Sequence, residues 1–301
     1  MSAAQELDRE RASRFGTIEE VEQALRSERY LADRGLAAAI LLALTMGRPL
    51  LLEGEVGVGK TEVAKTLQRI LGAELIRLQC YEGIDAGQAL YEWDYSRQLL
   101  YARLQHDAGA DPEHQISALY GPQFLLERPL LKAIRADEPS VLLIDEVDRA
   151  DNEFEAFLLE TLSDFSVSIP ELGTIVAAQP PVVILTSNRT RELHDALKRR
   201  CVYHWIGFPG IEQEVEIIRM RAPAVSDALA QSVAAAVARL RTLDLVKSPG
   251  PAEAIDWAQA LSILGAEAVA GDAMRMTLGW VIKNRDDLHT VEAQLDRVAA
   301  G

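Results

Sequence analysis

The residues with the clearest chemical potential form the octapeptide Gly54-Glu55-Val56-Gly57-Val58-Gly59-Lys60-Thr61. Its spacing matches G-x-x-x-x-G-K-S/T, a loop that wraps the phosphates of a nucleoside triphosphate. Glycines let the backbone turn tightly and direct N–H groups at phosphate oxygens, and Lys60 adds a cation for the β- and γ-phosphates. The Thr61 hydroxyl is placed to ligate Mg²⁺. We expect nucleotide contacts from Glu55, Val56, Gly57, Val58, Gly59, Lys60, Thr61 and Glu62. The sequence therefore predicts binding of ATP or GTP.

A second pair of polar residues ends an apolar run. The run Val141-Leu142-Leu143-Ile144 precedes Asp145 and Glu146 and describes a buried parallel strand that emerges where α/β proteins bind ligands. Adjacent strand residues point in opposite directions, so the two acids have different tasks. One carboxylate can hold the Mg²⁺ shell beside Thr61, and the other can polarise the water that attacks the γ-phosphate. The alternative is an ordinary acidic helix N-terminus; the phosphate loop upstream favours catalysis.

A third candidate, Asn188, follows another apolar strand, Pro181 to Ser187. Beside the Asp145 strand it can orient the attacking water or touch the γ-phosphate, although asparagine after a strand is commonly a turn residue. One helix later come Arg199 and Arg200. Basic residues at a helix C-terminus often only compensate the dipole. In an oligomeric ATPase, however, this is where an arginine reaches the neighbouring subunit's γ-phosphate, and we favour Arg200 over Arg199 for that role.

The elements that position these residues alternate between strand and helix. We expect strands at 48–53, 75–80, 141–144 and 182–186, and helices at 17–27, 31–46, 62–71, 124–135 and 153–162, with a hairpin at 165–177 and a less regular stretch at 81–120. After Pro209-Gly210 the pattern is helical, over 212–221, 226–242, 251–264 and 273–284. This order predicts a parallel α/β domain and a helical lid. We place a flexible segment at 1–16, the nucleotide-binding domain at 17–209 and the lid at 210–301.

Composition narrows the class of protein. A chain of 301 residues with 49 % hydrophobic content can bury one large and one small core. The longest apolar run, Leu36 to Leu44, is too short to span a bilayer. The acidic residues 1–8 do not resemble a secretory signal, and Cys80 and Cys201 are far apart, so we expect a cytoplasmic protein with free cysteines. No histidine has metal-ligand spacing. The formal charge of −15 argues against gripping nucleic acid phosphates as the main task.

Longer strings extend these motifs. They are Arg48-Pro49-Leu50-Leu51-Leu52-Glu53-Gly54, Leu78-Gln79-Cys80-Tyr81-Glu82-Gly83-Ile84-Asp85, Ile144-Asp145-Glu146-Val147-Asp148-Arg149, Ile169-Pro170-Glu171-Leu172-Gly173, Thr186-Ser187-Asn188-Arg189-Thr190-Arg191-Glu192-Leu193, Leu197-Lys198-Arg199-Arg200-Cys201 and Ala254-Ile255-Asp256-Trp257-Ala258. Together the chain resembles an AAA+ ATPase, and most closely the MoxR family in the branch typified by the carbon monoxide dehydrogenase maturation factor CoxD. The resemblance covers about residues 30–285. The phosphate loop is common to all phosphate-loop proteins, whereas the long strings are specific to the branch.

This resemblance implies an AAA+ phosphate-loop fold, with helices on both faces of a parallel sheet and a small all-helical lid. It implies a hexameric ring that hydrolyses ATP with Mg²⁺ and remodels a client protein beside a partner with a von Willebrand factor A (VWA) domain. In this branch the client is a molybdenum hydroxylase or carbon monoxide dehydrogenase-like metalloenzyme awaiting its metal centre. Lys60 and Thr61 would hold phosphate and Mg²⁺, and Asp145 and Glu146 would form the second acidic motif. Asn188 would be the first sensor, Arg200 the arginine finger, and residues 165–177 a hairpin facing the pore.

One departure from the family concerns the lid. Many AAA+ lids carry a second sensor arginine in the first turn of a helix near residue 250, but Ser248 to Glu253 contains none. Lys247 or Arg275 can substitute, or the contact is absent. Three alternatives to a remodelling ATPase stay open. They are a nucleic-acid-directed AAA+ motor, against which the acidity argues, a nucleotide-switched scaffold with little turnover, and, more distantly, a small-molecule kinase.

Overall fold

The computed structural model describes residues 14–106 and 118–295. Residues 1–13 of the expected flexible segment, and 107–117 of the stretch expected to be irregular, lie outside the described residues. The described chain forms two compact units. The first, here called the sheet unit, comprises 14–21, 34–53, 64–106 and 118–204. The second, the lid unit, comprises 22–33, 54–63 and 205–295, so the phosphate loop groups with the lid helices.

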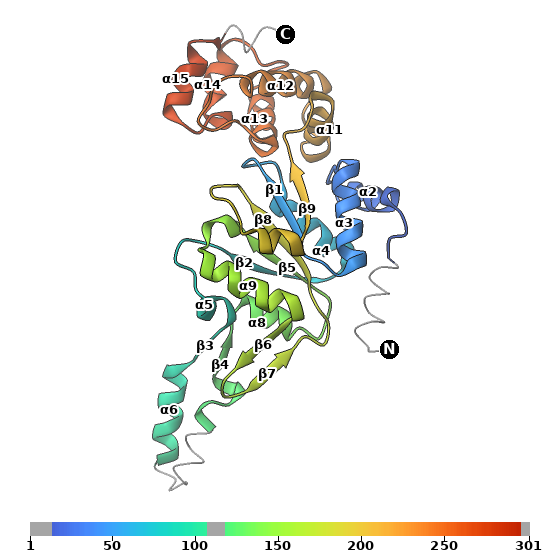
Figure 1. Ribbon diagram of the computed structural model, residues 1–301. Coiled ribbons are helices and arrows are strands. Elements are labelled where there is room, and N and C mark those ends of the chain that lie inside the picture. Colours follow the sequence, from blue (N-terminus) through green and yellow to red (C-terminus); the bar gives the residue numbers. More distant parts are fainter. Residues whose placement is uncertain (1–13, 107–117, 296–301) are drawn as a thin grey trace. The chain divides into compact units, whose positions relative to one another are not determined.

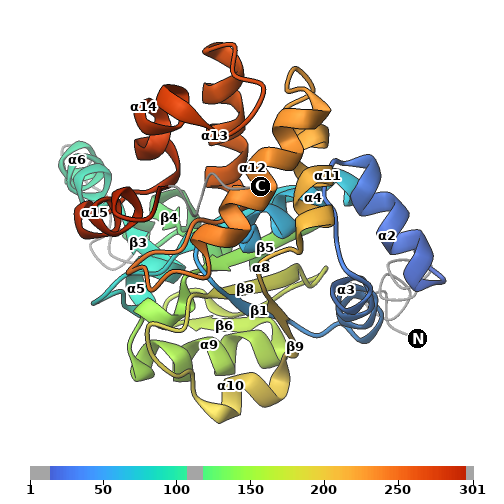
Figure 2. The same cartoon turned by 90° about the horizontal axis from the view of Figure 1, so that it is seen from above.

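Five strands form the main sheet in the order β2-β5-β8-β1-β9 (Figures 1 and 2). Their bounds are β1 Leu50–Gly54, β2 Glu74–Gln79, β5 Ser140–Asp145, β8 Val182–Ser187 and β9 Val202–Ile206. The pairs β2·β5, β5·β8 and β8·β1 are parallel, with Gln79 opposite Asp145 and Glu53 opposite Ser187. The carboxyl ends of these strands therefore meet at one edge, where polar residues replace the apolar runs.

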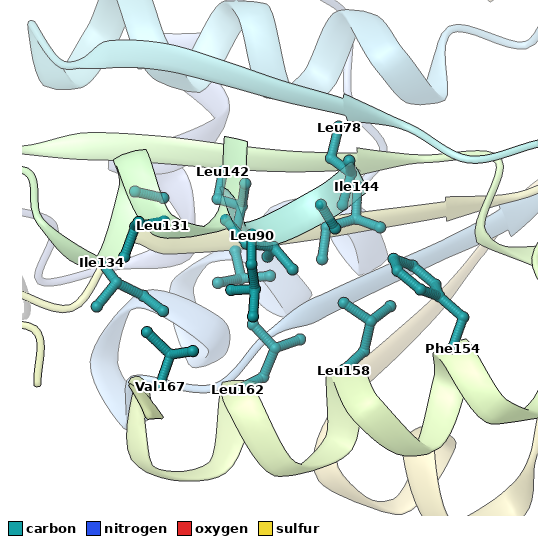
Figure 3. Close-up of a cluster of buried hydrophobic side chains, with 14 of the residues drawn as sticks. Leu78, Leu90, Leu131, Ile134, Leu142, Ile144, Phe154, Leu158, Leu162 and Val167 are labelled. Carbon is teal, nitrogen blue, oxygen red and sulfur yellow. The ribbon is translucent and has the colours of Figure 1, made fainter. Parts of the chain in front are cut away.

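Helices precede or connect the strands, and α8 and α9 pack against the sheet. They are α2 Ile18–Ser27, α3 Arg34–Met46, α4 Lys60–Leu71, α5 Ala86–Leu90, α6 Tyr95–His106, α8 Pro129–Ile134, α9 Asn152–Asp164 and α10 Asp195–Arg200, with short 3-10 segments η1 Pro122–Phe124 and η2 Val147–Arg149. Alternate residues of β5 face opposite sides of the sheet, as its apolar run requires. Leu142 and Ile144 lie in a core with α8 and α9, where Leu158 and Leu162 point toward the strands (Figure 3).

Two small hairpins flank the sheet. β6 Ser166–Ile169 and β7 Gly173–Val176 form the hairpin expected at 165–177, with Gly173 at φ +79 in the turn. The other joins β3 Tyr91–Trp93 to β4 Leu125–Glu127, and here the expected helix from residue 124 is wrong. Arg128 precedes Pro129 and is held extended (φ −94, ψ 169), because the proline ring disfavours helical backbone before it. The helix begins only at Pro129, which suits a first helical position.

The lid unit is built from helices α11 Ile211–Arg221, α12 Asp227–Leu240, α13 Pro251–Ile263, α14 Gly271–Val281 and α15 Arg285–Glu292. The four expected helices are present, and α15 is an addition. Trp257 is fully buried at the centre of this core, and its indole N–H donates to Thr277 Oγ1 at 2.8 Å. The predicted class, a parallel α/β sheet with a helical lid, is confirmed.

Candidate active site

The phosphate loop folds around the ammonium group of Lys60. This side chain is 7 % exposed, and its Nζ donates to the carbonyls of Gly54 at 2.8 Å and Glu55 at 2.7 Å. Gly57 (φ +84) and Gly59 (φ +96) adopt the left-handed backbone that the tight turn requires. Lys60 also begins α4, so the positive end of a 12-residue helix lies at the loop. A buried cation and a helix N-terminus together form a site for an anion such as a phosphate.

The first turn of α13 packs onto this loop within the lid unit. A Cβ atom on Gly250 would lie 2.9 Å from the carbonyl carbon and oxygen of Gly57, so the two backbones touch at glycines. Glu253 accepts the Gly250 N–H through Oε2 at 3.1 Å, and Lys247 Nζ lies 3.6 Å from Glu253 Oε1. The first turn of α13 therefore holds a carboxylate, Glu253, paired with Lys247. Of the two candidate substitutes, the structure places Lys247 beside this turn.

We expect Gly250→Ala to weaken nucleotide binding, because the added methyl group meets the backbone of Gly57 and cannot be relieved by a side-chain movement. The expected loss is about 1–3 kcal/mol, shared between stability and affinity. Thermal unfolding and calorimetry with an ATP analogue measure the two parts. Gly279→Ala is the matched control, since a Cβ there meets nothing within 4 Å inside α14. If the two variants had the same melting temperature and the same affinity for the ATP analogue, the importance of this contact would be contradicted.

A cavity of about 210 Å³ adjoins the loop in the same unit. Its lining combines the segment before α3, the loop and two lid helices: Arg29, Tyr30, Leu31, Gly57, Val58, Gly59, Glu62, Ile217, Arg221, Pro251, Ala252 and Ile255. Apolar walls with a few polar groups suit a flat base next to a phosphate site. Burial, helped by the charges of Asp33 and Glu62, raises the pKa of Tyr30 and keeps its hydroxyl neutral. The sequence predicted nucleotide contacts for the four loop residues of this lining but not for the others, which come from three further segments without a shared motif.

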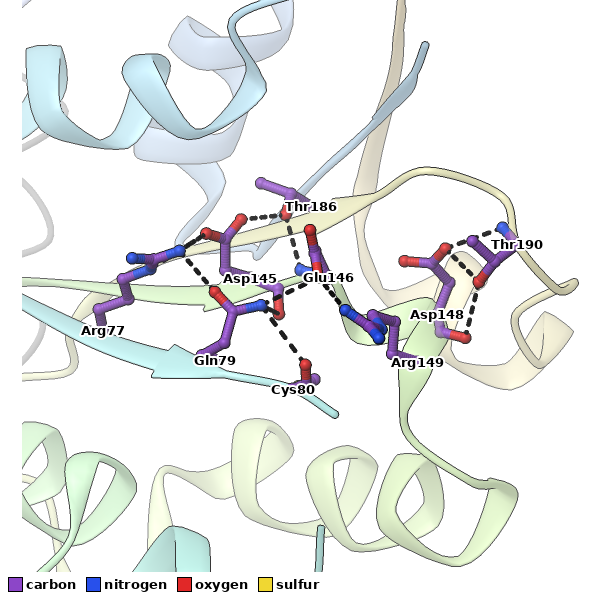
Figure 4. A network of polar contacts seen from close by, with 9 residues as sticks. All are labelled: Arg77, Gln79, Cys80, Asp145, Glu146, Asp148, Arg149, Thr186 and Thr190. Carbon is purple, nitrogen blue, oxygen red and sulfur yellow. Dashed lines mark hydrogen bonds and ion pairs between the residues drawn. The ribbon is translucent and has the colours of Figure 1, made fainter. Parts of the chain in front are cut away.

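In the sheet unit, Asp145 and Glu146 occupy separate environments at the end of β5 (Figure 4). Asp145 is 3 % exposed. Its Oδ1 accepts from Thr186 Oγ1 at 2.6 Å, and its Oδ2 accepts from Arg77 Nε at 3.0 Å and from Arg77 Nη2 at 2.5 Å. The Glu146 backbone is left-handed (φ 55), and its N–H donates to Thr186 Oγ1 at 2.9 Å. Asp145 is therefore the buried last residue of β5, and the backbone turns at Glu146.

The side chain of Glu146 is held by two further residues. Oε2 accepts from Gln79 Nε2 at 3.1 Å and from Arg149 Nη1 at 3.2 Å (Figure 4). One turn further, Asp148 accepts from the backbone N–H and the hydroxyl of Thr190. These bonds tie the segment after β5 to the segment after β8, which contains Asn188. Asn188 is partly exposed and follows the last residue of β8, between β5 and β1 in the sheet order.

The arginine candidates end α10. Both Arg199 and Arg200 are exposed, and both line an open cavity of about 250 Å³ together with residues of α9 and the segment before β1. Arg200 Nη1 donates to the Leu159 carbonyl at 2.8 Å and to the Ser163 hydroxyl, so α9 supports this side chain. Cys201 lies in the same lining, and burial raises the pKa of its thiol to about 12. The cavity therefore presents guanidinium groups and no reactive thiolate.

The model of one protein family matches residues 49–201, just over half of the chain. That family is described as the AAA domain, dynein-related subfamily. The chain belongs to this AAA domain family. The matched range includes β1 to α10, and so contains the phosphate loop, the acids at the end of β5, Asn188 and the arginines of α10.

Solved structures with the same fold include RuvB of Thermotoga maritima. A proline-to-glycine mutant of that protein superposes with a TM-score of 0.50 at 19 % identity, covering 92 % of this chain and 74 % of that one. The structure titled RuvB Holliday junction branch migration motor, also from Thermotoga maritima, gives a TM-score of 0.47 at 18 % identity over 92 % of this chain and 75 % of that one. None of the curated proteins compared with the chain matches it significantly. At this identity the first likeness supports the AAA+ fold alone.

The donor atoms of this AAA domain suit a nucleotide with Mg²⁺. A threonine hydroxyl at position 61 and the Asp145 carboxylate are hard oxygen donors, and Mg²⁺ is commonly held by one or two such groups with phosphate oxygens and water. Over residues 14–106 and 118–295, no group of three or more His, Cys, Asp or Glu side chains forms a metal cluster. Burial and the nearby charges of Asp145, Asp148 and Glu146 raise the pKa of Cys80 to about 12, so its thiol stays protonated at neutral pH. In the same ranges, no helix has the length and apolarity needed to cross a membrane.

Proposed function

We propose that the protein is an ATP-hydrolysing remodelling ATPase of the MoxR type. AAA domain proteins are generally ATPases, and the observation that carries the assignment is the pairing of a Lys60-centred loop with two separately held carboxylates after β5. The loop follows β1 directly in the chain, and β1 lies beside β8 in the sheet. The proposed nucleotide is ATP with Mg²⁺, bound through residues 55–62.

In the proposed reaction, Lys60 and the loop N–H groups hold the β- and γ-phosphates. Thr61 and Asp145 would hold Mg²⁺, and the ion would supply positive charge for the phosphate oxygens. Glu146 polarises a water and accepts its proton while Asn188 orients that water. Gln79 and Arg149 fix the Glu146 carboxylate in the structure described here. An arginine of a neighbouring copy, Arg200 in our assignment, stabilises the charge of the transferring phosphoryl group.

We further propose a hexameric ring with the hairpin β6·β7 toward the pore. The support is the exposure of Arg199 and Arg200, which reach no phosphate of their own sheet edge because they precede β9 at its opposite end. Following the resemblance, the ring acts in the cytoplasm with a VWA-domain partner on a molybdenum hydroxylase or carbon monoxide dehydrogenase-like client. The proposed functional domains are 17–209 for the nucleotide and 210–301 for the lid.

The competing functions have direct tests. One of the similar structures, RuvB, is named as a branch migration motor, which is a property of that protein. For this chain, the formal charge of −15 argues against movement along a nucleic acid. Filter binding at low salt separates a nucleic acid motor from a protein-remodelling ATPase. A nucleotide-switched scaffold would bind ATP yet show no steady-state phosphate release.

The client is best sought with Glu146→Gln, which should bind ATP, lose the water-polarising carboxylate and retain the client. The matched control is Glu153→Gln on the exposed side of α9, which removes the same charge. We expect cell extracts to yield an acceptor metalloenzyme and a VWA-domain protein with the first variant and neither with the second. Recovery of nucleic acid alone would contradict the remodelling function.

A further inference from the structure

Glu53 is a buried carboxylate that the proposed reaction does not use. It is 4 % exposed and lies one residue before the phosphate loop. Burial of a carboxylate costs free energy unless its oxygens accept hydrogen bonds. Here each oxygen has one: Oε1 accepts from Ser187 Oγ at 3.2 Å and Oε2 from Tyr203 Oη at 3.1 Å. The donors belong to β8 and β9, the two neighbours of β1 in the sheet (Figure 2).

The hydrogen bond between Ser187 and Glu53 lies next to Asn188, the residue that follows Ser187 in the chain. A hydroxyl has one proton, and a carboxylate only accepts, so donation to Glu53 fixes the direction of the Ser187 O–H. The oxygen of Ser187 is then free to accept from the backbone N–H of Arg189 at 3.1 Å. This bridge between residues 187 and 189 closes a turn with Asn188 at its middle. Arg189 has φ +57, an uncommon backbone for a non-glycine residue that its surroundings must hold.

The bond to Tyr203 fixes the other oxygen of the carboxylate. Burial raises the pKa of Tyr203, and the hydrogen bond and charge of Glu53 raise it further, while the charge of Arg189 acts in the opposite direction. The phenol therefore stays protonated and donates at neutral pH. With both oxygens engaged, the carboxylate cannot rotate away from Ser187 without losing the Tyr203 bond.

We propose that Glu53 is a positioning residue for ATP hydrolysis, which sets the orientation of Asn188 through Ser187 and is itself fixed by Tyr203. This inference rests on the proposed function, because it takes Asn188 as the residue that orients the attacking water. Glu53 touches neither nucleotide nor water in this scheme. Substitution of Glu53 should therefore change only the rate of hydrolysis, and only in proteins that retain Asn188.

The first test is Glu53→Gln. Glutamine has nearly the same shape but only one accepting group, so the two hydroxyl donors can no longer both be satisfied in their present directions. We expect kcat to fall about tenfold, the cost of about one lost hydrogen bond in the transition state. KM for ATP and the calorimetric affinity for an ATP analogue should stay within about twofold of the parent protein, because the loop residues are unchanged. Tyr203→Phe removes the bond to Glu53, and Ser187→Ala removes both the bond to Glu53 and the bond from the Arg189 N–H. Both variants should lower kcat in the same direction.

The matched control is Tyr91→Phe, which removes a hydroxyl from a partly buried tyrosine on β3, away from β1. It should leave kcat unchanged. The decisive comparison repeats Glu53→Gln in an Asn188→Ala background, with single-turnover hydrolysis as the readout. A positioning role predicts no further loss there, whereas a general weakening of the sheet predicts the same tenfold loss and a lower melting temperature.

The outcomes separate the inference from the function it rests on. If the parent protein hydrolyses ATP and Glu53→Gln, Tyr203→Phe and Ser187→Ala all match its kcat, the role of Glu53 is overturned and the ATPase function stands. An equal loss from Glu53→Gln with and without Asn188 also overturns it. If the parent shows no hydrolysis under any condition, both the function and the role of Glu53 fall together.

Discussion

Lys60→Ala is expected to lower the affinity for ATP by about 10²–10³-fold, because two charge-assisted hydrogen bonds to phosphate oxygens are worth about 3–4 kcal/mol together. The side chain is buried inside the loop and begins α4, so no other cation of the loop can take its place. Calorimetry with a non-hydrolysable ATP analogue and Mg²⁺ measures the loss. Tight binding by the variant would mean that the loop does not hold the phosphates.

The matched control for this prediction is Lys65→Ala, an exposed lysine one turn along the same helix. It removes the same charge and should leave the affinity unchanged. Lys60→Ala also removes the hydrogen bonds to the carbonyls of Gly54 and Glu55. Because the bond to the Gly54 carbonyl is buried and the bond to the Glu55 carbonyl is partly buried, we expect the free energy of unfolding to fall by about 1–2 kcal/mol and the melting temperature by about 2–8 °C. A much larger fall in the melting temperature would mean that the loss of affinity reflects unfolding of the variant.

The sequence was sufficient for the strands that end in polar residues. β1, β5 and β8 are short apolar runs followed by glycine or acidic or amide residues, and a buried parallel strand is the structure that satisfies this pattern. It was insufficient at residues 125–127, where an apolar stretch of helical appearance pairs with β3 instead. The proline at 129 carried the correct information, since it excludes helical backbone at the residue before it.

The candidate site divides in the same way. Lys60 belongs to one short motif and Asp145 and Glu146 to another, so each could be proposed from local spacing alone. Glu53 could not, because within its strand it looks like an isolated acid, and its partners Ser187 and Tyr203 are more than 130 residues away in sequence. The cavity beside the loop has the same origin, with lining residues from four separate segments. Contacts of this kind are set by strand order and packing, which no local pattern contains.

Arg200→Ala is expected to bind ATP almost normally and to hydrolyse it about 10³–10⁵-fold more slowly, because a trans-acting arginine stabilises charge that develops only in the transition state. In the structure α9 supports the guanidinium through the Leu159 carbonyl and the Ser163 hydroxyl, which favours a defined orientation. Arg199→Ala is the matched control, with the same charge lost from the same exposed helix end. If Arg199→Ala shows the large loss and Arg200→Ala does not, the assignment between them is wrong.

A mixture of inactive variants tests whether this arginine acts between subunits. Glu146→Gln should be as inactive as Arg200→Ala, because it loses the water-polarising carboxylate of its own subunit. In mixed rings some interfaces combine an intact Glu146 on one subunit with an intact Arg200 on its neighbour, so partial phosphate release should return once subunits exchange. Native mass spectrometry establishes the exchange, and a mixture of Arg200→Ala with Arg200→Lys provides a pairing that restores no interface.

Exchange without recovered activity would mean that Arg200 acts within its own subunit or that the ring requires every site intact. Full activity of a strictly monomeric species would eliminate the trans arginine, because a monomer has no neighbour to supply it.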